Sequence, residues 1–251
     1  MLVMGILNVT PDSFADGGRH NDLEAAVARG LEMIAEGVDI IDIGGESTRP
    51  GADRVSEVEE IARTIPVITE LAKHGVRISI DTMRASTAEA AIKAGASIIN
   101  DVSGGLADSE MLQAAARLQV PYIAMHWRGQ SKDMNSKAIY GDVVSDVISE
   151  LNERIQAALD AGIQKDKLII DPGLGFAKDA QHNWAIIDSI DRFVALGYPV
   201  LVGGSRKRFL GGETPDEREQ ATIELTKRLG TTGVWAVRVH SVKPHKEVLS
   251  A

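Results

Sequence analysis

The amino-acid sequence predicts an α/β protein, specifically a single (β/α)8 TIM barrel over residues 1–251. Eight short segments rich in Val and Ile recur along the chain, and a loop and a helix-period stretch follow each of them. Their spacing is about 33 residues, the length of a βα unit. The first segment is followed by NVTPDSFADGG rather than GxGxxG. That difference disfavours the alternative architecture, an open doubly wound sheet.

The predicted strands are apolar runs bounded by turn residues. Runs such as LIID and SIIND are nearly continuous, which is typical of parallel strands buried on both faces, whereas residues 39–43 alternate. In chain order the strands begin near Val3 (VMGILN), Asp39 (DIIDIG), Arg77 (RISID), Ser97 (SIIND), Pro121 (PYIAMH), Lys167 (KLIID), Pro199 (PVLVG) and Val234 (VWAVRVH).

Helices are predicted between the strands. The clearest has an apolar stripe at 3.6-residue spacing, formed by Val143, Val144, Val147, Ile148, Leu151, Ile155, Ala158 and Leu159. The others are expected near 22–36, 56–73, 85–94, 109–118, 179–195 and 216–229. A short last helix, 241–251, contains Pro244, whose missing N–H is tolerated only in a first turn. Long connections follow the first, second and seventh strands (8–21, 44–56 and 203–216), on the face where barrel enzymes build their active sites.

Composition excludes several classes of protein. The chain has 27 Lys+Arg against 36 Asp+Glu, a formal charge of −9, which argues against nucleic acid or an anionic membrane as a partner. The absence of Cys excludes disulfides, thiolate nucleophiles and Cys-ligated metal sites. No apolar run approaches the roughly 20 residues of a membrane span, and Met1–Val9 has no leader pattern, so we expect a cytoplasmic protein.

Polar side chains collect at the carboxyl ends of the predicted strands. Residues two apart on a strand share a face, so placing the apolar partner inward assigns the neighbouring polar residue to the barrel mouth. This rule gives Asn8 with Ile6, Asp42 with Ile40, Asp81 with Ser79, Asn100 with Ile98, Met125 with Ile123, Asp171 with Ile169, and Arg238 and His240 with Val234 and Ala236. The seventh strand ends at Gly203-Gly204 and leads to Ser205-Arg206-Lys207-Arg208.

Taken singly, each of these residues could be a helix cap or a loop partner, and Arg238 could simply pair with a neighbouring Asp. His126, on the opposite face from Met125, is expected to be structural or peripheral. Unpartnered buried polar groups cost about 1–3 kcal/mol each, so the set must be satisfied internally or by a polar ligand, and we favour the ligand.

The residue types indicate the ligand's chemistry. Asp81, Asn100 and Asp171 suit a planar heterocycle whose edge presents N–H donors, whereas Lys207, Arg238, Arg49 and His240 suit phosphate oxygens. A hydrolytic two-metal site would need several His at strand ends, and only His126 and His240 of the six are well placed.

Seven motifs resemble dihydropteroate synthase of bacterial folate synthesis, in the family's order and over nearly the whole chain. They are LNVTPDSFADGG (7–18), GGESTRPGA (44–52), SIDT (79–82), NDVSGG (100–105), DPGLGFAK (171–178), GGSRKRFLG (203–211) and RVH (238–240). The resemblance implies a transferase that condenses 6-hydroxymethyl-7,8-dihydropterin pyrophosphate with 4-aminobenzoate, giving 7,8-dihydropteroate and pyrophosphate. It also implies a Mg²⁺ cofactor, inhibition by sulfonamides and a homodimer.

The resemblance further implies roles for individual residues. The pterin would be bound by Asp81, Asn100, Met125, Asp171, Phe176, Gly203, Lys207 and Arg238. Pyrophosphate would be bound by Asn8, Thr48, Arg49, Arg238 and His240, with Asn8 also a metal ligand, and aminobenzoate by Phe14, Pro50, Lys207 and Arg208. The catalytic group would be Asp81, Asp171, Lys207, Arg238 and His240, acting in an SN1-like reaction whose C–O bond breaks before nitrogen attacks.

The sequence departs from the family pattern in three places. Ser241 stands where family members often have an acid that could orient His240, and Gly204 replaces the more familiar Ala or Thr. The short last helix lies where the family's dimer contact is expected, which weakens the homodimer expectation.

Two rival functions share parts of this pattern. A pterin-binding methyltransferase would share the heterocycle pocket but would not need the phosphate-binding cations. A non-catalytic paralogue would be expected to have lost Asn8, Lys207 or Arg238, and all three are present.

Overall fold

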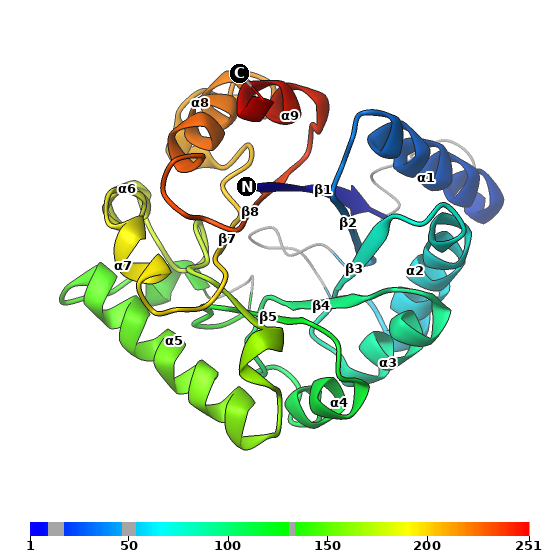
Figure 1. Ribbon diagram of the computed structural model, residues 1–251, viewed down its shortest axis with the longest axis horizontal. Helices are drawn as coiled ribbons and strands as arrows, with labels where there is room; N and C mark the ends of the chain where they lie inside the picture. Colours follow the sequence, from blue (N-terminus) through cyan, green and yellow to red (C-terminus); the bar gives the residue numbers. More distant parts are fainter. Residues whose placement is uncertain (10–17, 47–53, 131–133, 251) are drawn as a thin grey trace.

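The computed structural model describes residues 1–9, 18–46, 54–130 and 134–250. In these ranges eight parallel strands form one sheet in the order β6-β5-β4-β3-β2-β1-β8-β7, and helices surround it (Figure 1). The predicted TIM barrel is confirmed. The strands are β1 (Leu2–Asn8), β2 (Ile40–Gly44), β3 (Arg77–Asp81), β4 (Ile98–Asp101), β5 (Tyr122–Met125), β6 (Leu168–Asp171), β7 (Leu201–Val202) and β8 (Ala236–Val239).

The two outermost strands of this order, β6 and β7, nearly close the ring. A single parallel bridge joins Ile170 to Val200, just before β7, and the Ile170 amide donates to the Pro199 carbonyl at 3.0 Å. Every other strand pairs with its neighbours in parallel register. All the strands therefore end at one mouth of the barrel.

The helices follow the predicted order, with one correction. The segment 179–195, predicted as one helix, forms α6 and α7, because Ser189 lies between them with φ −114° and ψ 25°, outside the helical region. The helices are α1 (Gly18–Ala35), α2 (Glu57–Ala72), α3 (Ala85–Ala94), α4 (Met111–Leu118), α5 (Val143–Asp160), α6 (Ala180–Asp188), α7 (Ile190–Val194), α8 (Glu219–Leu229) and α9 (Lys243–Ser250), with short 3-10 turns η2 (Met134–Lys137), η3 (Lys165–Lys167) and η4 (Arg208–Leu210).

Helix ends have local chemical causes. The Asp142 side chain accepts from the amides of Val144 and Ser145, both at 3.0 Å, and so caps the start of α5. Pro244 is the second residue of α9, in the first turn, as its missing N–H requires. None of the described helices is long and apolar enough to cross a membrane.

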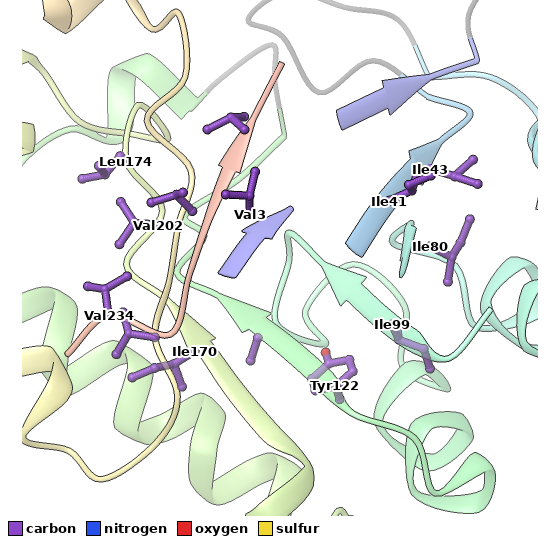
Figure 2. Close-up of a cluster of buried hydrophobic side chains, with 14 of the residues drawn as sticks. Val3, Ile41, Ile43, Ile80, Ile99, Tyr122, Ile170, Leu174, Val202 and Val234 are labelled. Atoms are coloured by element: carbon purple, nitrogen blue, oxygen red, sulfur yellow. The ribbon is translucent and has the colours of Figure 1, made fainter. Parts of the chain in front are cut away.

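The core has two layers, one on each side of the strands. The outer layer lies between strands and helices and includes Val3, Ile41, Ile80, Ile99 and Ile170 (Figure 2). The inner layer fills the barrel and consists of Met4, Ile40, Ile98, Ile123, Ile169, Leu201 and Ala236. This division matches the predicted alternation, with one correction. Val234 belongs to the outer layer because it precedes β8, where strand alternation does not apply.

Candidate active site

Asp42, Asp81, Asn100, Asp171 and Arg238 come from the ends of β2, β3, β4, β6 and β8, each two residues beyond an inward-facing position. The strand register places Asp81 beside Asn100 and Met125 beside Asp171. The four polar residues other than Arg238 are all buried. The sequence rule therefore assembles one polar cluster at the mouth.

Arg238 joins two of the carboxylates. Its Nε donates to Oδ2 of Asp42 and its Nη2 donates to Oδ2 of Asp81, both at 2.6 Å. The same Asp42 oxygen accepts from Nδ2 of Asn100 at 3.1 Å. Burial lowers the pKa of Arg238, but the two carboxylates outweigh this and raise it, so the guanidinium stays charged. Burial also raises the pKa of Asp81, and Arg238 opposes that rise.

Asp42 is the member of this cluster that strand alternation placed on the inner face but to which the sequence gave no role. It is fully buried and holds both Arg238 and Asn100 in position. The position of Asp42 two residues after the inward-facing Ile40 is the feature of the sequence that indicates its place in the cluster. The second oxygen of Asp42, Oδ1, has no hydrogen-bond partner among the described residues.

Asp171 lies on the opposite side of the cluster, where the β6–α6 loop begins. Its Oδ1 accepts from the Gly173 amide at 2.7 Å, and its Oδ2 lies 3.7 Å from where a Cβ on Gly203 would be. Burial raises the pKa of Asp171, while the Gly173 amide, Lys207 and Arg238 lower it. Gly203 thus forms the part of the wall between Asp171 and Arg238.

Lys207 reaches the cluster from the loop after β7. Its Nζ donates to the Leu174 carbonyl and lies 4.6 Å from the centre of the Phe176 ring. A Cβ on Gly175 would come within 2.8 Å of the Lys207 side chain, so this glycine leaves room for it. Burial lowers the pKa of Lys207 to about 8, against the opposing effect of Asp171.

The turn that presents Lys207 depends on the preceding residue. Arg206 adopts φ +57°, an uncommon conformation for a residue with a side chain. Its amide donates to Oγ1 of Thr222 at 3.1 Å, and its guanidinium donates to Glu219 at 2.6 Å and to Ser241 Oγ at 2.9 Å. Contacts with α8 and with the segment after β8 therefore hold the turn.

Ser205, to which the sequence pattern assigned no role, orients His240. Nδ1 of His240 lies 2.9 Å from Ser205 Oγ, and the His240 amide donates to the same oxygen at 3.2 Å. The side chain at position 241, expected to bear on His240, instead contacts Arg206. Ser241 therefore supports the Lys207 turn.

The other predicted site residues fall into three groups. Met125 packs with Met83 and Val102, and Phe176 lies against this group, which makes an apolar wall. Asn8 ends β1 and is partly buried, and Arg208 is exposed at the start of η4. Phe14, Thr48, Arg49 and Pro50 lie outside the described residues.

A second buried ionic group lies behind Asp81, and the sequence pattern did not predict it. Arg84 pairs with Glu60 and, at 3.0 Å, with Glu46, while Oγ1 of Thr82 donates to Glu60 at 2.6 Å. Glu46 also accepts from the Val55 amide at 3.2 Å. These contacts tie the end of β3 to α2 and to the described ends of the 44–56 connection.

Comparisons with known proteins agree with this geometry. A profile of pterin-binding enzymes matches residues 4–240. The dihydropteroate synthase of Mycobacterium leprae is 47% identical over 257 residues, covering 98% of this chain and 90% of that protein. The structure of Xanthomonas albilineans dihydropteroate synthase with 4-aminobenzoic acid has a TM-score of 0.93 and 44% identity, covering 99% of this chain and 90% of that one.

The Yersinia pestis dihydropteroate synthase in a sulfonamide drug complex also has a TM-score of 0.93, with 40% identity over 99% of this chain and 92% of that one. Profile, relative and structures each cover nearly the whole chain, including every described strand end that carries a polar residue of the cluster. The chain therefore belongs to the pterin-binding enzymes and, among them, to the dihydropteroate synthases.

Proposed function

We propose that the cluster at the barrel mouth condenses 6-hydroxymethyl-7,8-dihydropterin pyrophosphate with 4-aminobenzoate, with the residue roles given below. The observation that carries these roles is the buried arrangement of Asp81, Asn100 and Asp171 around Arg238, with Lys207 on the adjacent loop. It combines acceptors for the N–H edge of a pterin with cations for an oxygen-rich leaving group.

The pterin would lie between the carboxylates and the apolar wall. Asp171 accepts from the pterin's 2-amino group and N3, and Asn100 and Asp81 meet the other ring edge. Lys207 donates to the carbonyl oxygen and N5. Its ammonium already lies over the Phe176 ring and beside Asp171, so little rearrangement is needed.

The leaving pyrophosphate would face Arg238, His240 and Asn8. Arg238 keeps its charge because Asp42 and Asp81 hold it, and Ser205 fixes the direction of the His240 ring. Because these cations are already in position before the reaction, they stabilise the charge that develops on the leaving group without a rearrangement of the protein.

The donor set fits Mg²⁺ bound mainly through the substrate. The described residues include no group of three or more His, Asp or Glu that could hold a metal, and Mg²⁺ commonly uses one or two protein oxygens together with substrate phosphates. The side-chain carboxamide oxygen of Asn8 would bind the ion. A second oxygen, the unpartnered Oδ1 of Asp42, lies on the neighbouring strand, since β1 pairs with β2. When bound, the ion would neutralise charge on the leaving pyrophosphate.

The reaction needs no protein nucleophile. Cleavage of the C–O bond leaves a delocalised pterin cation, which the carboxylates of Asp81 and Asp171 stabilise until the arylamine nitrogen attacks. The protein contributes position and electrostatic stabilisation. We also propose that the enzyme is a cytoplasmic homodimer, which light scattering of the purified protein and fractionation of cells would test.

The decisive assay is pyrophosphate release from dihydropterin pyrophosphate and Mg²⁺, with and without 4-aminobenzoate, together with chromatography of the products. Release together with 7,8-dihydropteroate is the expected result. Binding without release would identify a non-catalytic paralogue, and absence of binding would refute the assignment of the mouth.

A further inference from the structure

Lys178 is a buried cation to which neither the sequence nor the proposed reaction gives a role. Its side chain is 8% exposed. Its Nζ lies 2.8 Å from Nδ1 of His126, 3.1 Å from the Gly173 carbonyl and 3.0 Å from the Phe176 carbonyl. An ammonium group has three donors, so these contacts use its whole capacity. Lys178 therefore acts on the protein and not on a substrate.

The histidine beneath it is fixed as a neutral link. Its Nε2 lies 2.9 Å from Oε2 of Glu150 on α5, and that carboxylate also accepts from Nε and Nη2 of Arg128. Burial raises the pKa of Glu150, but hydrogen bonds from His126 and Arg128 outweigh this and lower it to about 2. A carboxylate at Nε2 requires the proton on Nε2, which leaves Nδ1 as the acceptor for Lys178.

The protonation state of His126 agrees with this assignment, and the contacts of Lys178 decide its own. Burial and the nearby Lys178 lower the pKa of His126 to about 4, so the ring is neutral at pH 7. Burial lowers the pKa of Lys178 well below its usual value, although Asp171 opposes this. Because all three partners of Nζ act as acceptors, the geometry favours the ammonium form.

The loop that Lys178 holds carries the pterin pocket. The Gly173 amide donates to Asp171, the Leu174 carbonyl accepts from Lys207, and Phe176 lies against the apolar wall. Lys178 binds the carbonyls of Gly173 and Phe176, on either side of Leu174. A Cβ on Gly173 would come within 2.4 Å of the His126 carbonyl, so the loop also packs closely on the end of β5.

We propose that Lys178, supported by His126 and Glu150, is a positioning residue that fixes the 172–177 loop so that Asp171, Phe176 and Lys207 meet the pterin. The proposal rests on the proposed pterin site. Loss of Lys178 therefore weakens binding of the pterin half of the substrate and spares binding of its pyrophosphate half.

The charge of Lys178 gives a second consequence. The cations that face the Asp171 carboxylate are Lys207 from the loop after β7, Arg238 from β8 and Lys178 from its own loop, and each lowers the pKa of Asp171. Removing Lys178 leaves the opposing effect of burial less compensated. Asp171 accepts from the pterin only as a carboxylate, so the acid limb of the pH profile of kcat/KM should move to higher pH in a variant that lacks Lys178.

The test compares three variants by titration calorimetry and by the pH profile of kcat/KM. Lys178→Met removes the charge and all three hydrogen bonds. His126→Asn keeps an acceptor near the Nδ1 position and loses the link to Glu150. Tyr140→Phe, the matched control, removes one neutral hydrogen bond to Ala177 of the same loop, 3.0 Å long, and no charge. The ligands are dihydropterin pyrophosphate and, separately, inorganic pyrophosphate with Mg²⁺.

For Lys178→Met we expect the Kd of dihydropterin pyrophosphate to rise about tenfold or more, as for loss of a charged hydrogen-bond network. For the same variant we expect the Kd of inorganic pyrophosphate to change less than twofold. For His126→Asn we expect the Kd of dihydropterin pyrophosphate to rise about threefold. For Tyr140→Phe we expect no shift of the acid limb of kcat/KM.

Three results separate the possibilities. Unchanged pterin affinity in Lys178→Met, or an equal loss for both ligands, overturns the positioning role while leaving the pterin site intact. Failure of the unsubstituted protein to bind dihydropterin pyrophosphate overturns the proposed function as well. If Lys178→Met does not fold, His126→Ala removes the same support, and unchanged pterin affinity in that variant overturns the proposal.

Discussion

The charge on Lys207 makes activity depend on pH in a direction that the structure specifies. Burial lowers the pKa of this ammonium to about 8. A cation that donates to the pterin acts only while it is protonated, so activity is present below this pKa and is lost above it. Between pH 7 and pH 9 the protonated fraction falls from about nine-tenths to about one-tenth. We therefore expect kcat/KM for dihydropterin pyrophosphate to fall about tenfold over this interval.

The assay is the initial rate of pyrophosphate release at subsaturating dihydropterin pyrophosphate and saturating 4-aminobenzoate. Lys207→Arg is the control, because a guanidinium remains charged at pH 9 but has a different shape. It should be less active at pH 7 and lack the alkaline limb. A limb present in both proteins would belong to substrate ionisation. A flat profile for the unsubstituted protein would refute the reasoning, as would unchanged pterin affinity in Lys207→Ala, for which we expect a loss of about 1.5–3 kcal/mol.

Three further predictions concern the same site. Asp171→Asn exchanges an acceptor for a donor facing the pterin, so turnover should be nearly abolished with an unchanged circular dichroism spectrum, and normal turnover would reject the pairing. Asp42→Asn removes the charge that holds Arg238 and Asn100, with charge-assisted contacts at 2.6 and 3.1 Å. The free energy of unfolding should fall by about 2–3 kcal/mol and Tm by about 5 °C, together with kcat/KM, and an unchanged calorimetric Tm would show that Arg238 is held by Asp81 alone. Sulfonamides should raise the KM for 4-aminobenzoate without lowering kcat, and a lowered kcat at unchanged KM would place them at another site.

Much of the fold followed from local patterns. Strands buried on both faces produce short Val- and Ile-rich runs, and their regular spacing is sufficient to predict the barrel. Alternation along each strand separated inner residues such as Ile40 and Ile169 from outer residues such as Ile41 and Ile170. The break at Ser189 was missed because the apolar pattern continues through it.

The candidate site was predictable only in part. The positions of Asp81, Asn100, Asp171 and Arg238 at one mouth follow from strand parity, since all parallel strands end on the same side. Which acceptor pairs with which donor does not follow, because side chains from β4 and β8 share one oxygen of Asp42 on β2.

By itself the sequence determined the barrel, the inner face of its strands and the family to which the motifs belong, because each is a property of residues close together in the chain. Only the tertiary structure decided that Asp42 holds Arg238, that Ser205 orients His240, and that Lys178 supports the pterin loop through His126 and Glu150. Those pairings join residues up to 196 positions apart. They depend on side-chain contacts of 2.6–2.9 Å between distant parts of the chain, and no periodicity along the sequence predicts them.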